Sequence, residues 1–154
     1  SGRSNKNGGL SLGGESLCHE QPQPRKISSM TNGMELIAQA WENREGPAVL
    51  ATVDAAKAPN VIYVGEIRYV PGTGFIVADN YFCKTRANIK SGSRGAILFL
   101  TKDRKSFQVK GPLSYHTDGP VFENMRSWHD PKYPGVAATR LRVEAAYSGA
   151  EQLL

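Results

Sequence analysis

The sequence predicts a mainly β fold, a small β-barrel of six antiparallel strands with a few helices at its ends. Short apolar runs rich in Val, Ile, Phe and Tyr are separated by tight turns of Gly, Pro and Asp, which is typical of strands that pair antiparallel. A chain of 154 residues with 40% hydrophobic content suits one domain that buries its own core. Six strands in this length favour a closed barrel over an open sandwich, because closure removes exposed strand edges.

The first predicted helix is capped by Thr31 or Asn32 and runs to about Arg44. Helical spacing places four apolar residues on one face: Met34, Ile37, Ala38 and Trp41. Gly46 suits a helix end and Pro47 cannot continue a helix, so the chain is expected to leave the helix there.

The other elements follow from alternating apolar runs and turn signals. Strands are predicted at residues 48–53, 60–70, 75–78, 96–100, 107–115 and 136–147. Two further helices are predicted. One covers residues 84–91. The other is capped by residues 117–120 and ends at Trp128. The predicted order is therefore helix, three strands, helix, two strands, helix, strand.

Residues 1–29 differ in composition from the rest of the chain, being rich in Gly, Ser, Asn, Gln and Pro. They contain little to bury, which predicts a disordered tail or a leader left from expression, with the domain over residues 30–154. We interpret the two cysteines, Cys18 and Cys83, as free thiols in a reducing cytoplasm.

The charge and motif content exclude several classes of protein. A net charge of +5 suits a phosphorylated small ligand or a weak nucleic-acid contact and does not choose between them. No apolar run approaches the ~20 residues that span a bilayer, so a membrane protein is excluded. His19, His116 and His129 lack the spacing of metal ligands, and no dinucleotide fingerprint, Walker motif or nucleophile elbow is present.

The most informative segment is the one in which a predicted strand ends and a short helix begins. Lys84, Thr85 and Arg86 are consecutive there, at a helix start whose free N–H groups favour anions. Two cations and a hydroxyl donor at this position fit a phosphate group. The same pattern also fits a simple cap on a solvated basic helix, and the residues alone do not separate the two.

Four segments, in this order, resemble one known family: residues 59–65 (PNVIYVG), 84–89 (KTRANI), 115–120 (YHTDGP) and 148–154 (SGAEQLL). The family is that of the FMN-binding split barrels related to pyridoxamine 5′-phosphate oxidase, and the likeness is strongest to the small bacterial FMN-binding proteins. The resemblance covers about residues 33–154. Its most specific part is the segment from Lys84 to Asn88, in its place between a strand and a helix.

The resemblance implies a six-stranded split barrel that forms a homodimer with FMN at the interface. It implies that Lys84 and Thr85 bind the FMN phosphate and that Asn88 supports that loop or the ribityl chain. Main-chain segments would face the flavin ring from two sides: Tyr63, Val64 and Gly65, and Ala78, Asp79 and Asn80. The sequence departs from similar proteins at Val64 and Gly65, where polar or aromatic residues are common.

The activity implied is that of an FMN-dependent oxidoreductase or an electron carrier, with a nicotinamide or another small redox partner. No residue is assigned as a catalytic acid or base. True pyridoxamine phosphate oxidase activity is not expected, because the chain ends at Leu154 without the second basic cluster that such a substrate requires.

Two alternatives remain open. The same fold could bind another planar cofactor, haem or deazaflavin. A small basic barrel could instead bind single-stranded nucleic acid by stacking bases in a basic groove, although this partner is not favoured. The basic turn would then consist of Lys102, Arg104 and Lys105. The aromatic platforms would be Tyr63, Tyr69 and Phe107.

Overall fold

An antiparallel sheet of nine strands and three helices make up the part of the chain that the computed structural model describes, residues 30–154. The predicted tail, residues 1–29 with Cys18 and His19, lies outside the described residues. The helices are α1 (Met30–Glu42), α2 (Lys84–Lys90) and α3 (Gly119–Trp128). The strands are β1 (Arg44–Val53), β2 (Pro59–Val64), β3 (Ile67–Val70), β4 (Gly74–Asp79), β5 (Arg94–Thr101), β6 (Ser106–His116), β7 (Ala137–Leu141), β8 (Ala145–Ser148) and β9 (Glu151–Gln152).

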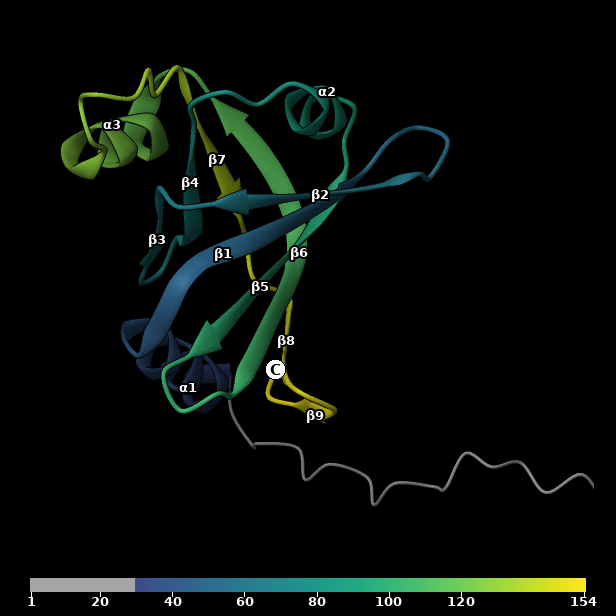
Figure 1. Ribbon diagram of the computed structural model, residues 1–154, viewed down its shortest axis with the longest axis vertical. Helices are drawn as coiled ribbons and strands as arrows, with labels where there is room; N and C mark the ends of the chain where they lie inside the picture. The colour runs from purple at the N-terminus through teal and green to yellow at the C-terminus, as the bar shows by residue number, and fades with distance from the viewer. Residues whose placement is uncertain (1–29) are drawn as a thin grey trace, which may run out of the picture.

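The sheet is antiparallel throughout and curls into a half-barrel (Figure 1). The strand order is β2-β1-β5-β6-β7-β4-β3, with β8 beside β6 and β9 beside β8. The prediction of a mainly β, antiparallel split barrel is confirmed. The predicted count of six strands is wrong, because two runs that look continuous in the sequence are broken in the structure and the short strand β9 was not predicted.

The first break falls at Gly65 and Glu66, which divide the predicted strand 60–70 into β2 and β3. β2 pairs with β1, whereas β3 pairs with β4 on the other side of the barrel. One continuous run in the sequence therefore forms two strands that pair with different partners. Local periodicity cannot reveal this change of partner strand.

The second break divides the predicted strand 136–147 into β7 and β8, and it lies opposite Gly111 of β6. The N-terminal half of β6 pairs with β8 and its C-terminal half pairs with β7. A Cβ atom at Gly111 would collide with the carbonyl oxygen of Arg142, so only glycine lets the two backbones approach here. The glycine is the reason that β6 can change partner at this point.

The barrel interior is built around an aromatic cluster. The Trp41 ring meets Phe75 and Phe99 edge to face, with ring centres 5.0 Å apart in each pair. On α1, Ile37 and Trp41 are buried as predicted, and Ala40 joins them. The other two residues of the predicted apolar face, Met34 and Ala38, are half-buried.

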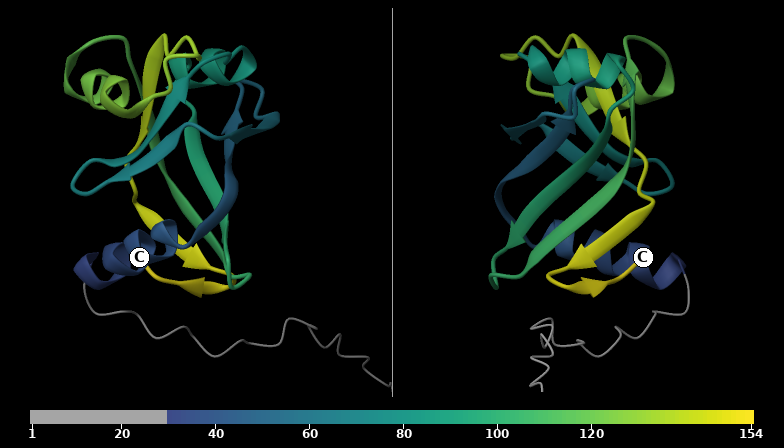
Figure 2. Two further views of the ribbon diagram at one scale, coloured as in Figure 1. Left: turned by 60° about the vertical axis from the view of Figure 1, so that its left-hand side comes forward. Right: turned by 90° about the vertical axis from the view of Figure 1, so that its right-hand side faces the viewer.

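Helices α2 and α3 lie at one end of the barrel, whereas α1 and the C-terminus lie at the other (Figures 1 and 2). α3 covers the outer face of β4 and β7 through a small second core of Met125, Ile76 and Ala138. Among the described helices, none is both long enough and apolar enough to cross a membrane.

Candidate functional site

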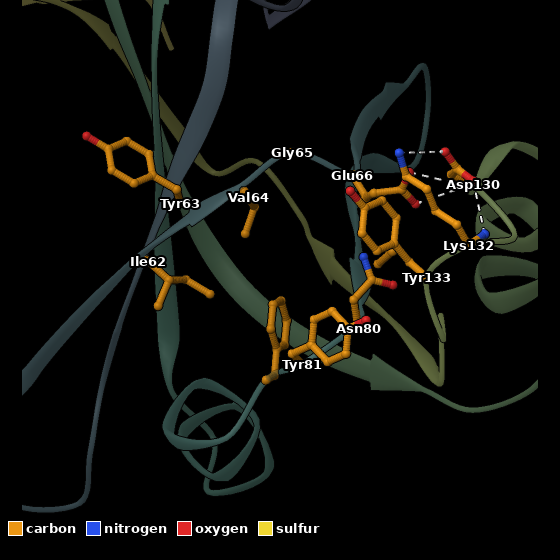
Figure 3. Close-up of a pocket in the computed structure, with 12 residues that line it drawn as sticks. Ile62, Tyr63, Val64, Gly65, Glu66, Asn80, Tyr81, Asp130, Lys132 and Tyr133 are labelled. Carbon is orange, nitrogen blue, oxygen red and sulfur yellow. Dashed lines mark hydrogen bonds and ion pairs between the residues drawn. The ribbon is translucent and has the colours of Figure 1, made fainter.

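A cavity of about 640 Å³ opens beside the end of β2, between that strand, the loop after β4 and the loop after α3 (Figure 3). This volume lies within the roughly 300–1,000 Å³ of pockets that bind small ligands and cofactors. The residues that line the cavity are Ile62, Tyr63, Val64, Gly65, Glu66, Ala78, Asn80, Tyr81, Phe82, Asp130, Lys132 and Tyr133.

The β2 wall of the cavity contains Tyr63, Val64 and Gly65, three of the predicted residues. The Val64 side chain is 5% exposed, whereas the Tyr63 ring is 78% exposed and points away from the other cavity residues (Figure 3). Tyr63 therefore faces the cavity with its main chain. A Cβ at Gly65 would meet no atom within 4 Å, so a ligand can approach the backbone closely at that point.

The opposite wall begins at the end of β4, where the predicted residues Ala78 and Asn80 line the cavity. The Oδ1 atom of Asn80 accepts a 3.0 Å hydrogen bond from the main-chain N–H of Gly135. The carbonyl of Asp79 accepts another, 2.9 Å long, from the N–H of Val136. These two bonds attach the loop that carries Tyr133 to the end of β4.

Asp79, also predicted, does not line the cavity with its side chain; its carboxylate is buried and holds the neighbouring elements together. It accepts hydrogen bonds from Nε and Nη2 of Arg86 at 2.7 and 3.1 Å, from the Tyr115 hydroxyl at 2.6 Å and from the N–H of Phe82 at 2.9 Å. Burial raises the pKa of Asp79, but these hydrogen bonds outweigh it, so the pKa lies below its ordinary value. The carboxylate thus stays charged and fixes the loop of residues 80–83.

Because Arg86 forms this two-point ion pair with Asp79, its charge is already matched. The sequence pattern suggested that Arg86 would join Lys84 in holding an anion. In the structure the guanidinium instead links α2 to the end of β4, and Lys84 is the cation of this segment without a partner among residues 30–154.

The predicted phosphate-binding residues lie at the start of α2, and none of them lines the cavity itself. Lys84 is exposed. Thr85 is 2% exposed, and its hydroxyl oxygen accepts a 3.0 Å hydrogen bond from Nδ2 of Asn60, which leaves the hydroxyl proton to donate. Asn88 is buried and donates from Nδ2 to the hydroxyl of Thr52, so its side chain ties α2 to β1.

Several residues of the cavity lie outside the predicted set. Tyr81 and Phe82 directly follow Asn80, and their position in the same strand-to-helix loop is the signal that could have found them. Asp130, Lys132 and Tyr133 come from a loop that long-range pairing brings to β4, and no local pattern indicates this. Where this loop meets the cavity, both carboxylate oxygens of Glu66 lie 3.2 Å from the main-chain nitrogen of Asp130 and accept its N–H.

Two of the three aromatic platforms expected of a nucleic-acid barrel are not available. Tyr69 packs against Phe75 in the core, with ring centres 5.2 Å apart, and Phe107 stacks on Phe99. In the basic turn, Lys105 pairs with Asp103. Of the three predicted platforms only Tyr63 is exposed. Residues 30–154 also hold no group of three His, Cys, Asp or Glu side chains that could bind a metal ion.

The sequence profile of pyridoxamine 5′-phosphate oxidase matches residues 36–150. The chain belongs to the pyridoxamine 5′-phosphate oxidase family. Among curated proteins, no sequence matches it.

Solved structures similar to this family member include proteins that are named for different ligands. HupZ of Group A Streptococcus is 25% identical, with a TM-score of 0.64, over 74% of this chain and 91% of its own. An FMN-binding protein of Syntrophomonas wolfei is 17% identical, with a TM-score of 0.54, over 75% and 90% of the two chains. HutZ, a haem storage protein of Vibrio cholerae, is 18% identical, with a TM-score of 0.56, over 74% and 92%. The fold is therefore shared by a protein named for FMN binding and a protein named for haem storage.

Proposed function

We propose that the chain is a flavoprotein that binds FMN non-covalently in the cavity beside β2. The observation that carries the proposal is the composition of this cavity: main-chain segments at Val64–Gly65 and Ala78, with the aromatic side chains of Tyr81, Phe82 and Tyr133 around them. Main-chain groups can meet the polar rim of a flat ring, and aromatic side chains can cover its faces.

The start of α2 supports the proposal for the phosphate. Lys84 is exposed, has no ion-pair partner among residues 30–154, and follows the loop that forms one wall of the cavity. The free hydroxyl proton of Thr85 is next to it in the chain. Asn88 would act by holding α2 against β1. Together these residues would bind the phosphate at one end of the cofactor.

The lining of the cavity favours a flavin over haem. Haem iron in proteins is held by His, Cys, Met or Tyr side chains. The described cavity residues include no His, Cys or Met, so Tyr81 and Tyr133 are the side chains there that could ligate haem iron. A flavin requires no axial ligand.

We further propose that two copies associate through the outer face of β2, β1 and β5. Cross-strand neighbours form two apolar rows on this face, one of Tyr63, Val49 and Leu98 and one of Val61, Ala51 and Ala96. Tyr63, Val61 and Leu98 are 78%, 61% and 44% exposed. A contiguous exposed apolar patch of this kind marks an interaction surface. It adjoins the cavity at Tyr63, which supports a homodimer with the cofactor near its interface.

When bound, FMN supplies the redox chemistry, and the protein binds, orients and tunes it. The chain would then serve as an oxidoreductase or as an electron carrier, with a nicotinamide or another small redox partner. The cytoplasmic location stays a prediction from the sequence.

The experiment is the visible spectrum of the purified protein after addition of excess FMN and gel filtration. Retained bands near ~370 and ~450 nm are expected of a bound flavin. A Soret band would identify haem, and a colourless protein that does not retain FMN would overturn the proposal.

A pair of variants on one helix tests the phosphate site. Loss of a charge-assisted hydrogen bond should raise the FMN dissociation constant of Lys84→Gln about 10- to 100-fold. Lys90→Gln removes the same charge from the last turn of α2 and should leave FMN affinity unchanged. Equal affinity in the two variants would contradict the assignment of the phosphate to Lys84.

A further inference from the structure

A second cleft, of about 430 Å³, is lined by residues from the end of α1, the start of β1 and β3. Its lining residues are Trp41, Glu42, Arg44, Ile67, Arg68 and Tyr69. It shares no lining residue with the cavity beside β2. The cleft is therefore a separate site from the proposed FMN cavity.

Arg44 is a half-buried cation without a counter-ion. Its guanidinium lies over the Trp41 ring, with Cζ 4.0 Å from the ring centre, and its Nη1 atom is buried without a hydrogen-bond partner. Burial lowers the pKa of Arg44. None of the ion pairs among residues 30–154 includes Arg44. Because charges removed from water are normally paired, a carboxylate is the group that this position lacks.

The facing wall of the cleft is the free edge of a strand. β3 ends the strand order of the described sheet and pairs only with β4. The N–H of Ala78 donates to the carbonyl of Glu66, so the antiparallel pattern directs the main-chain groups of residues 66, 68 and 70 toward β4. The N–H and C=O groups of Ile67 and Tyr69 therefore point to the open side, where they remain free to pair with another strand.

The charged side chains that line the cleft are Arg44, Arg68 and the exposed Glu42, and of these Arg44 is the one with a buried nitrogen that has no partner. The Arg68 guanidinium is over the Trp128 ring, 5.3 Å from its centre, and so lies on the α3 side of β3. Arg44 is thus the cation that a ligand on the β3 edge would meet.

We propose that this cleft binds an extended peptide segment of a partner protein, which pairs with the free edge of β3 and places a carboxylate on Arg44. Three residues of strand span about 10 Å and suffice to pair with Ile67 and Tyr69. A peptide backbone can form hydrogen bonds with both the N–H and the C=O groups along the β3 edge. A small anion can pair with Arg44 but cannot form this pattern of bonds.

The test is an NMR titration of the uniformly ¹⁵N-labelled protein with a five-residue acetylated and amidated peptide of alternating threonine and valine around a central glutamate. Saturable shifts are expected at the amides of Ile67 and Tyr69 and at Nε of Arg44. The same peptide with glutamine in place of glutamate should bind about tenfold more weakly. A peptide methylated at all five residue nitrogens has no residue N–H to donate to the strand edge and should lose the Ile67 and Tyr69 shifts.

Sodium acetate and two variants complete the design. Equal shifts with acetate alone would mean a simple anion site and would overturn the strand pairing. No saturable shift at Ile67 and Tyr69 with the glutamate peptide would overturn the proposal as a whole. Arg44→Gln should weaken the glutamate peptide about tenfold, whereas Arg142→Gln, at an exposed arginine paired with Glu144, should not. The comparison of the glutamate, glutamine and methylated peptides uses the wild-type protein alone, so the test holds even if Arg44→Gln is unstable.

Discussion

The hydroxyl of Tyr115 donates a 2.6 Å hydrogen bond to Oδ2 of Asp79, a residue that precedes it by 36 positions in the chain. This bond joins the C-terminal half of β6 to the end of β4, where the loop that forms one wall of the main cavity begins. The carboxylate also receives Arg86 and the N–H of Phe82, so one buried side chain positions β4, β6 and α2 relative to one another.

Removing the Tyr115 hydroxyl should therefore destabilise the fold and loosen the cavity wall. We expect Tyr115→Phe to lower the free energy of unfolding by about 1–3 kcal/mol, because a buried carboxylate loses a hydrogen bond. Urea denaturation followed by circular dichroism measures the change. Tyr147→Phe is the matched control, because the Tyr147 ring contacts Lys110 and its hydroxyl is not part of the Asp79 network. Equal losses in the two variants would contradict the role assigned to the Tyr115 bond.

Asp79 should also give the protein a specific acid sensitivity. Burial opposes its charge, but the hydrogen bonds from Arg86, Tyr115 and Phe82 lower its pKa below the ordinary 3.8. A carboxylate whose folded-state pKa is lowered contributes stability above its unfolded pKa, and that stability is lost as the pH falls through the folded-state pKa. In Tyr115→Phe the folded-state pKa of Asp79 should be higher and nearer its unfolded value, so the loss on acidification should be smaller and should be complete at a higher pH. Unfolding free energies measured from about pH 2 to pH 6 would show this displacement; superimposable pH profiles would contradict it.

The sequence predicted the class of the fold because that class depends on local signals. Apolar runs and turn residues indicated antiparallel strands, and α2 begins at Lys84 as expected. The two broken strands were not predictable, because the breaks at Gly65 and Arg142 follow from changes of pairing partner between distant segments. The same limit applies to the site. The resemblance named Val64 and Ala78, and both line the cavity. The loop of Asp130–Tyr133 is held at the cavity by hydrogen bonds from Gly135 and Val136 to Asn80 and Asp79, and these bonds leave no local pattern.

Two glycines that look alike in the sequence should respond very differently to alanine. Gly111→Ala would place a methyl group against the carbonyl oxygen of Arg142, and we expect a loss of about 3 kcal/mol or more in unfolding free energy. Gly65→Ala meets no atom within 4 Å, so its stability should change by less than about 1 kcal/mol. Thermal unfolding of the two variants tests this, and a stable Gly111→Ala protein would mean that β6 does not change partner at Gly111.

The apolar face of β2, β1 and β5 predicts the effect of charge on self-association. Leu98→Glu places a carboxylate among apolar neighbours and should raise the dissociation constant of the dimer at least about tenfold. Val136→Glu changes an equally exposed residue outside this face and serves as the control. Sedimentation equilibrium measures both. If Leu98→Glu and the control associate equally, the interface lies elsewhere.

Tyr63 contributes its main chain to the cavity and its ring to the apolar face, so one short segment of β2 belongs to two surfaces. Two binding equilibria that share a segment are linked, and the factor by which one tightens the other is the same in both directions. Retention of a small molecule by this chain should therefore depend on protein concentration. A dilute sample, in which the dimer dissociates, is expected to release a larger fraction of the bound molecule than dissociation from a single chain alone would give.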